Sequence, residues 1–240
     1  MTRYKLAVLL VLAALPLQAK PRTARPGADA LILKALAGPA TGYAAVERVQ
    51  VFLPGKKPKA LKVNVTALPS GRVRREVLPL RKKAASLVEV RDPERPEAGL
   101  ARLRSVYAIS VSTGGVVAKR KTWKLELRLK SGVLRRAWWV DRDSGLLMKR
   151  ETYRDDGTLR RRERIVKLEL PAPAPASFKL APVAGPWSPE GFAFAGGGGG
   201  TRRFTNGLES YEVAEAGGKL VVTGDLAEDD AARVLEAHGK

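Results

Sequence analysis

Residue types that usually carry enzyme chemistry are scarce in this 240-residue chain. It contains one histidine, His238, and no cysteine. A single histidine cannot supply a Ser-His-Asp triad or a conventional zinc site, and a chain without cysteine has no thiolate nucleophile and no disulfide. The five glycines 196–200 lack the Lys-Ser/Thr and the following helix of a phosphate-binding loop, so they indicate a hairpin loop. The sequence therefore predicts a protein that is not an enzyme and has no cofactor, with a packing or frayed-end role for His238.

Carboxylates gather instead in two short segments that are rich in turn residues. The segment DRDSG, Asp141–Gly145, superficially resembles a calcium loop but lacks the later ligands and the bidentate glutamate. The second segment is Asp155-Asp156-Gly157. Glycine supplies positive φ in hairpin turns, and aspartate folds back onto nearby backbone. We interpret both segments as tight turns that join three long strands between Arg135 and Leu170.

A hydrophobic period of two identifies the elements that these turns connect. In TWKLELRLK, residues 122–130, every second side chain is apolar and the others are polar or charged. In ALKVNVTAL, residues 60–68, the positions 61, 63, 65 and 67 are apolar and alternate with polar or charged residues. Such alternation is typical of antiparallel strands with one face on a core and the other in water. The predicted fold class is mainly β (α+β), a large curved antiparallel sheet with one helix that begins at an Asp29 N-cap and ends at Gly38. Further strands are expected at 46–53, 73–78, 103–111, 134–140, 146–153 and 159–170, with turns at 54–55, 70–71, 114–115 and 131–132.

The chain divides into four predicted segments. Residues 1–19 have a cationic start, an apolar run too short to span a bilayer and a small residue, Ala19, at the end. This pattern predicts a secretory signal peptide cut after Ala19, and no cysteine follows to carry a lipid anchor. Residues 20–170 form the β domain, the proline-rich residues 171–189 a linker, and residues 190–240 a small β-β-α unit that docks on the β domain. The mature chain is expected to be exported and to contain no transmembrane segment.

The charge balance indicates what kind of partner to expect. Lys and Arg number 44 against 24 Asp and Glu, a formal net charge of +20. An excess of this size favours anionic partners. For an exported chain these are lipid headgroups, lipopolysaccharide or acidic protein surfaces, and nucleic acid is not expected. A solvated basic face with no partner remains an open alternative.

One stretch of the chain resembles a known family. The pattern W-V-D-x-x-[ST]-G-L-L-x-[KR]-x-E is matched by Trp139-Val140-Asp141, Ser144-Gly145-Leu146-Leu147, Lys149 and Glu151. With the preceding strand VVAKRKTWKLELRLK and the tail segments WSPEGFAF and FTNGLESYEV, this resembles the MucB/RseB family of periplasmic sigma-E regulators. The N-terminal domain of that family is similar to the lipoprotein carriers LolA and LolB. The resemblance implies a half-open antiparallel barrel wrapped on a helix and enclosing an apolar cavity.

The same reading predicts the residues of a binding site. The alternating strands and the cavity implied by the resemblance give an apolar set at Trp123, Leu125, Leu127, Leu129, Trp138, Val140 and Met148. A basic rim at the mouth of the cavity is expected from Arg136, Arg160, Arg162 and Arg164, since their strands run from a cationic end to an apolar end. For the apolar set, ordinary packing in a protein core is the alternative.

The resemblance implies a function that the residues alone do not give. We expect an exported regulator or sensor of envelope stress that binds the periplasmic domain of an anti-sigma factor, another envelope protein, or an acyl-bearing anionic lipid or lipoprotein. The first alternative is a lipoprotein or lipid carrier of the LolA type. The second is a basic scaffold that binds anionic polymers of the cell envelope.

Overall fold

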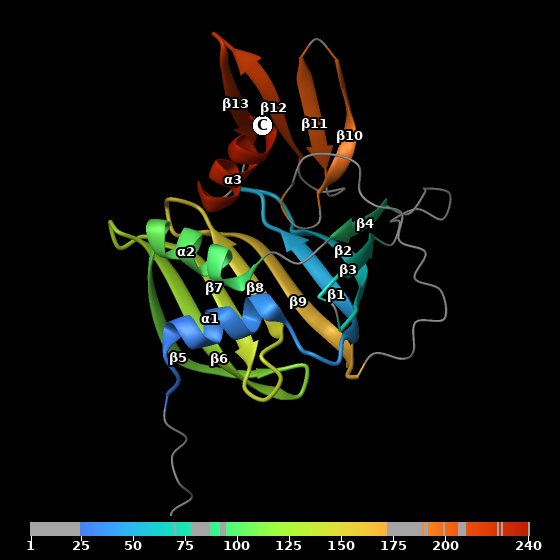
Figure 1. The fold of residues 1–240 in the computed structure, drawn as a ribbon, viewed down its shortest axis with the longest axis vertical. Helices are drawn as coiled ribbons and strands as arrows, with labels where there is room; N and C mark the ends of the chain where they lie inside the picture. The colour runs from blue at the N-terminus through green and yellow to red at the C-terminus, as the bar shows by residue number, and fades with distance from the viewer. Residues whose placement is uncertain are drawn as a thin grey trace, which may run out of the picture.

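The protein folds into one large antiparallel sheet, a smaller second sheet and three helices (Figure 1). The computed structural model describes residues 25–69, 71–77, 87–91, 95–171, 189, 192–198, 200–205, 210–224, 226 and 228–239. The expected signal segment and most of the expected linker lie outside these residues. Within the described part of the chain, no helix combines the length and the apolar character needed to cross a membrane.

The large sheet has nine strands in the order β4-β3-β2-β1-β9-β8-β7-β6-β5, and every neighbouring pair is antiparallel. β4 and β5 form its two open edges, so the sheet does not close into a barrel. This is the predicted fold class. The strands are β1 (Tyr43–Val51), β2 (Lys59–Ala67), β3 (Val73–Val77), β4 (Leu87–Arg91), β5 (Tyr107–Val117), β6 (Arg120–Leu129), β7 (Leu134–Asp141), β8 (Leu147–Tyr153) and β9 (Leu159–Glu169).

Two helices, α1 (Ala28–Ala37) and α2 (Pro96–Val106), cover one face of this sheet, which we call the inner face (Figure 1). The expected end of α1 at Gly38 is confirmed, but its N-cap is Gly27. Asp29 lies in the first turn and pairs with Arg104 of α2 at 2.5 Å.

The helix α2 corrects the predicted strand at 103–111, whose first four residues are helical. The sequence contains the signals for this helix. Proline occupies the first turn, where its missing N–H costs nothing, and Leu100, Leu103 and Val106 recur at a spacing of three. Leu103 is buried against the sheet while Leu100 and Val106 pack beside it. The chain is therefore helical as far as Val106, and the strand β5 begins at Tyr107.

The predicted turn at Gly114-Gly115 is also wrong, because β5 runs through both residues as far as Val117. The pairing register shifts between Thr113 and Gly115, which marks a bulge. A side chain at Gly114 would lie 2.9 Å from the ring of Trp139, so glycine here permits a close approach of strands. The hairpin turns instead at Ala118 and Lys119, which both have positive φ.

The two acidic segments do form hairpin turns, as predicted. Gly145 and Gly157 both have positive φ. In the second turn, Asp156 accepts hydrogen bonds from the backbone N–H and the hydroxyl of Thr158. In the first, the carboxylate that folds back is that of Asp141, which accepts from the N–H and the hydroxyl of Ser144. These bonds and the Arg120 guanidinium lower the pKa of Asp141, although its burial acts in the opposite direction.

The smaller sheet and the last helix form a C-terminal unit with its own core. Its strands follow the order β10-β11-β12-β13, and α3 packs against them. Phe204 stacks on Tyr211, and His238 meets the Phe204 ring edge-on at 5.3 Å, so the single histidine packs in this core. The unit has two strands more than the β-β-α pattern predicted. Its elements are β10 (Ala193–Gly198), β11 (Thr201–Thr205), β12 (Ser210–Ala216), β13 (Lys219–Gly224) and α3 (Glu228–His238).

Candidate functional site

A cavity of about 320 Å³ lies where the inner face of the large sheet, α1, α2 and the C-terminal unit meet. This volume is at the lower end of the roughly 300–1,000 Å³ that ligand pockets occupy. One part of its lining is apolar and comes from the large sheet, from both helices and from the C-terminal unit. It includes Leu36, Leu103, Trp138, Leu147, Phe192 and Leu226.

The rest of the lining is strongly charged. Among the residues that the structure describes, it holds seven arginines and four carboxylates, an excess of three positive charges. Such an excess, next to apolar side chains, suits a ligand that combines an anionic group with an apolar body. The arginines are Arg75, Arg102, Arg136, Arg150, Arg160, Arg161 and Arg233, and the carboxylates are Glu47, Glu163, Asp229 and Asp230.

Ion pairs hold several of these charges in place at the floor of the cavity. Glu47 on β1 and Arg75 on β3 are both buried and lie 2.7 Å apart. Glu163 on β9 contacts Arg150 on β8 and lies 2.7 Å from Arg161. Charges removed from water are tolerated only when they are paired and hydrogen-bonded, so these contacts fix the positions of the side chains.

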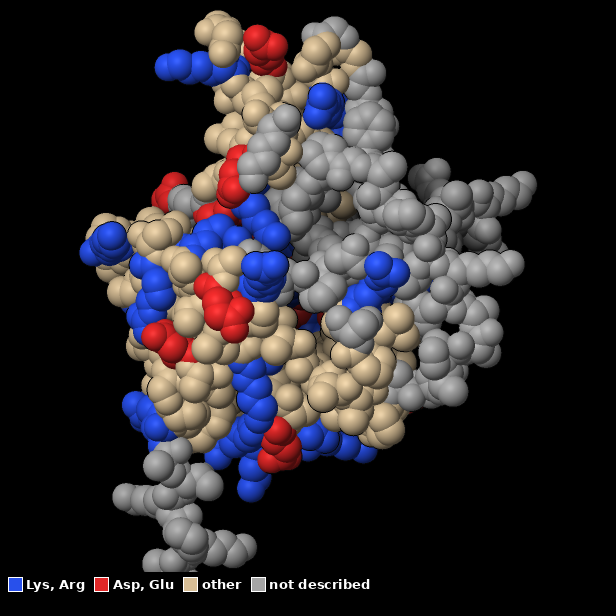
Figure 2. All heavy atoms as spheres, in the orientation of Figure 1, with Lys and Arg blue, Asp and Glu red and all other residues tan. Residues whose placement is uncertain are grey.

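A second set of ion pairs joins the large sheet to the C-terminal unit. Arg136 on β7 lies 2.7 Å from Asp229 and 2.7 Å from Asp230, both on α3, and the hydroxyl of Tyr107 donates to Asp229 at 2.9 Å. Figure 2 shows basic and acidic side chains meeting at this junction. Burial acts to lower the pKa of Arg136, but the two carboxylates raise it above its ordinary value. Burial raises the pKa of Asp229, and the like charge of Asp230 adds to that effect.

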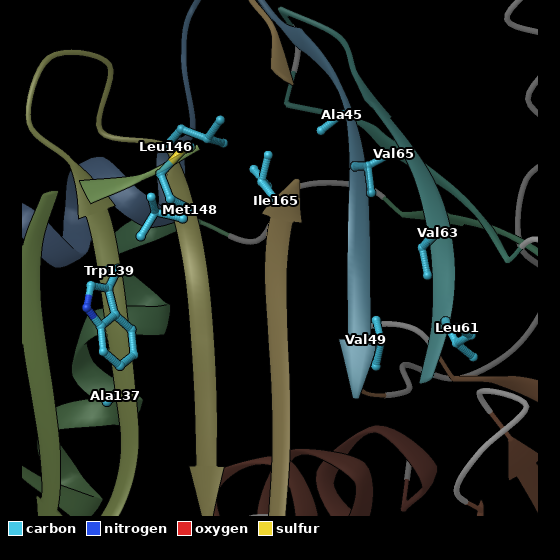
Figure 3. Close-up of a cluster of buried hydrophobic side chains, with 11 residues drawn as sticks. Ala45, Val49, Leu61, Val63, Val65, Ala137, Trp139, Leu146, Met148 and Ile165 are labelled. Carbon is cyan, nitrogen blue, oxygen red and sulfur yellow. The ribbon is translucent and has the colours of Figure 1, made fainter. Parts of the chain in front are cut away.

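The structure brings most of the predicted apolar set together, but chiefly as core. Trp123, Leu125, Leu127, Trp138 and Val140 form one cluster with Leu31, Ile32, Leu103 and Tyr107, and Leu129 packs at its edge. Of the seven predicted residues only Trp138 lines the cavity. Met148 belongs to a different cluster, with Trp139, Ile165 and residues of β1 and β2 (Figure 3). The pairing of β7 with β8 shifts register between Trp139 and Val140, beside Met148. Alternation along the strand therefore does not predict on which face of the sheet Met148 lies.

The predicted basic rim divides in the same way. Arg136 and Arg160 line the cavity, whereas Arg162 and Arg164 do not. Arg162 pairs with Glu151 at 2.7 Å, and Arg164 is exposed. Residues 160, 162 and 164 were expected to lead into an apolar end of the strand, but Val166 is 41% exposed. They therefore do not form one rim.

Sequence reasoning missed the buried charges of the cavity. Glu47 and Arg75 were not singled out, nor were Glu163, Asp229 and the helix residue Leu103. A signal was present for Glu47, because it interrupts an alternating apolar series at residues 45, 49 and 51 of β1. Such an interruption indicates a buried charge that needs a partner. The partner itself is set by the tertiary structure. No group of three or more metal-ligating side chains occurs among the described residues.

Comparison with solved structures identifies the architecture. No protein-family model and no curated protein matches this sequence. A crystal structure of MucB is similar with a TM-score of 0.50 and 17% identity, over 87% of this chain and 96% of that chain. The chain has a MucB-like fold. The similarity expected from the stretch around Trp139 is thus confirmed at the level of fold.

Two further structures show weaker similarity. The MucA/MucB complex of Pseudomonas aeruginosa matches with a TM-score of 0.48 and 18% identity, over 85% of this chain and 89% of that chain. A LolA superfamily protein, NE2245 from Nitrosomonas europaea, matches with a TM-score of 0.29 and 11% identity, over 60% of this chain and 94% of that chain.

Proposed function

We propose that this protein is an exported, non-enzymatic binding protein of the periplasm that takes an acyl-bearing anionic amphiphile into its cavity. The observation that carries this proposal is the lining, which combines an apolar wall around Trp138 with an excess of three positive charges. Apolar area removed from water supplies affinity, at most about 25 cal/mol per Å². The arginines orient the anionic head and favour it over a neutral one.

The junction with α3 gives this binding a regulatory consequence. Arg136 lines the cavity and is also held by Asp229 and Asp230. An anionic head that reaches Arg136 competes with those two carboxylates. Ligand binding and the attachment of the C-terminal unit are then coupled, and the protein works as a sensor whose two units respond to the ligand.

A protein partner extends the proposal. The structure of MucB with MucA(peri) and the resemblance to sigma-E regulators favour the periplasmic domain of an anti-sigma factor as that partner. A LolA-type carrier is the alternative. A gene neighbourhood with a sigma factor and a membrane anti-sigma protein supports the regulator, while neighbouring lipoprotein-transport genes support the carrier.

The two adjacent tryptophans provide a test with a built-in control. Trp138 lines the cavity, whereas Trp139 points to the opposite face of the sheet and does not. We expect Trp138→Ala to weaken binding of a fluorescent lauroyl phosphatidylglycerol about tenfold or more, equally at low and high salt, because apolar contacts are not screened. Trp139→Ala should change the affinity less than threefold.

Circular dichroism and thermal unfolding must first show that both variants are folded. If folded Trp138→Ala retains full affinity, or if both variants lose affinity equally, Trp138 is a core residue and the cavity is not the binding site. A matched lipid with a neutral headgroup tests the role of the arginines, since it should bind more weakly to the wild type.

A further inference from the structure

The outer face of the large sheet, opposite the helices, carries a line of cationic side chains that one tryptophan interrupts. Pairing partners directly opposite one another share a face of a sheet. The registers link Lys62 to Arg48, Arg48 to Arg164, Arg164 to Lys149, Lys149 to Trp139, and Trp139 to Lys124. These six positions, which we call the outer row, lie on the six adjacent strands β2, β1, β9, β8, β7 and β6. At about 4.8 Å per strand, the row is about 24 Å long.

One half of the outer row is unneutralised. Lys124 pairs with Glu126 at 2.6 Å, and Lys149 pairs with Glu151 at 2.9 Å. Lys62, Arg48 and Arg164 are exposed, and none of them has a carboxylate partner among the residues that the structure describes. Like charges directly opposite each other destabilise a sheet. The three adjacent like-charge pairs from Lys62 to Lys149 are therefore a cost that the fold itself does not explain.

Among the described residues of the outer face, the unneutralised positive charge lies along a line. Beside Arg48 and Lys62, the flanking positions on one side are Val46 and Asn64, and on the other they are Gln50 and Ala60. Beside Arg164, Arg162 is already paired with Glu151, and Lys167 with Glu169 at 2.7 Å. A flat anionic membrane would be matched by a two-dimensional patch of cations. A single file of cations about 5 Å apart matches a linear chain that carries regularly spaced negative charges.

The chemistry of the row also distinguishes between linear polyanions. Surfaces that bind single-stranded nucleic acids combine cations with exposed aromatic rings, on which the bases stack. The only aromatic residue of the outer row, Trp139, is 8% exposed, and Lys149 lies over its ring at 3.7 Å. It offers no stacking surface. We propose that the outer row is a docking site for a linear anionic polysaccharide, separate from the cavity on the inner face.

The experiment compares two variants of equal charge. In Arg48→Gln/Arg164→Gln the centre of the row is neutralised. In Lys56→Gln/Lys57→Gln two exposed lysines of the β1–β2 turn, outside the row, are neutralised instead. The probe is a heparin dodecasaccharide, and its binding to the full chain is measured from 50 to 300 mM NaCl. We expect the row variant to bind at least tenfold more weakly at 50 mM and the control variant to stay within threefold of the wild type.

The salt dependence gives a second readout. For single-stranded nucleic acids, each phosphate contact adds about 0.7 to the slope of log K against log [salt]. With a similar value for the heparin probe, the slope of the row variant should be shallower by about 1.4. Equal losses in both variants would show that only net charge matters and would overturn the proposal. So would equal competition by a single-stranded oligonucleotide of the same charge, or binding to phosphatidylglycerol vesicles that the row variant weakens while heparin binding stays unchanged.

Discussion

Adjacent residues on the same strand of the large sheet meet opposite electrostatic environments. On β1, Glu47 faces inward and pairs with the buried Arg75, whereas Arg48 faces outward between Lys62 and Arg164. On β9, Glu163 faces inward to Arg150 and Arg161, and the next residue, Arg164, is exposed on the outer face. On the inner face, the buried carboxylates of Glu47 and Glu163 each lie against an arginine. On the outer face, like charges lie side by side in contact with water, which weakens their repulsion without removing it.

Tryptophans and arginines share strands in this sequence because the two faces of each strand meet different surroundings. On β7, Arg136 and Trp138 face the cavity, while Trp139 faces outward between Lys124 and Lys149. A strand of period two carries two independent patterns, one for each face. Here one pattern builds an apolar and charged pocket, and the other builds a cationic surface. Removing a charge from a buried ion pair and removing one from the unneutralised half of the outer row should therefore have opposite effects on stability.

The largest effect is expected on the inner face. Glu47→Leu leaves the Arg75 guanidinium buried without this carboxylate, so we expect a loss of about 3 kcal/mol in the free energy of unfolding. The double variant Glu47→Leu/Arg75→Met should recover most of this loss, because it replaces the whole pair with apolar side chains. Urea unfolding monitored by tryptophan fluorescence measures both. A single variant within about 0.5 kcal/mol of the wild type would show that these buried charges do not depend on each other.

The sequence predicts the apolar alternation of the strands better than the pairing of their charged side chains. Alternation and turn residues are local properties, so they give the strands, the hairpins at Gly145 and Gly157 and the antiparallel sheet. The apolar pattern fails where a bulge shifts the register, as at Met148 and Gly114. Charge pairing depends on strands far apart in sequence, and Glu47 finds Arg75 only once β1, β2 and β3 lie side by side. Alternation within β9 therefore could not show that Arg160 reaches the cavity while Arg164 lies on the outer row.

An intermediate effect is expected at Glu151, a buried carboxylate on the outer face. Burial acts to raise its pKa, but hydrogen bonds from Tyr153, Lys149 and Arg162 outweigh this and lower the pKa. A lowered pKa means that the contribution of Glu151 to stability is fully present above its unfolded pKa of about 4.3 and is lost as the pH falls through the folded value. Glu151→Gln should therefore unfold at a lower temperature than the wild type at pH 7, and the gap should narrow between pH 5 and pH 3.

Thermal unfolding of both proteins across that range checks the sign. If the gap stays constant down to pH 3, the shape of the side chain matters and its charge does not. Glu151 would then no longer count as the neutralising partner of Lys149 and Arg162, and the contrast between the paired and unpaired halves of the outer row would disappear.

The smallest effect, and the one of opposite sign, is expected at Arg48. Arg48→Glu turns two like-charge cross-strand pairs, with Lys62 and Arg164, into two opposite-charge pairs. Such pairs contribute roughly 0.2–1 kcal/mol each, and exposure reduces this, so we expect a gain of about 0.5 kcal/mol. Arg48→Gln, which removes repulsion without adding attraction, should lie between the wild type and Arg48→Glu. Unfolding midpoints at 20 mM and 500 mM NaCl measure this order of stability. The differences should be smaller at high salt because the charges are solvent-exposed.

A variant that is more stable than the wild type but no longer binds heparin would show that the arginine is kept for binding at the expense of stability. If Arg48→Glu is less stable than the wild type at low salt, Lys62, Arg48 and Arg164 do not repel one another. The outer row then does not differ in this respect from the paired charges of the inner face.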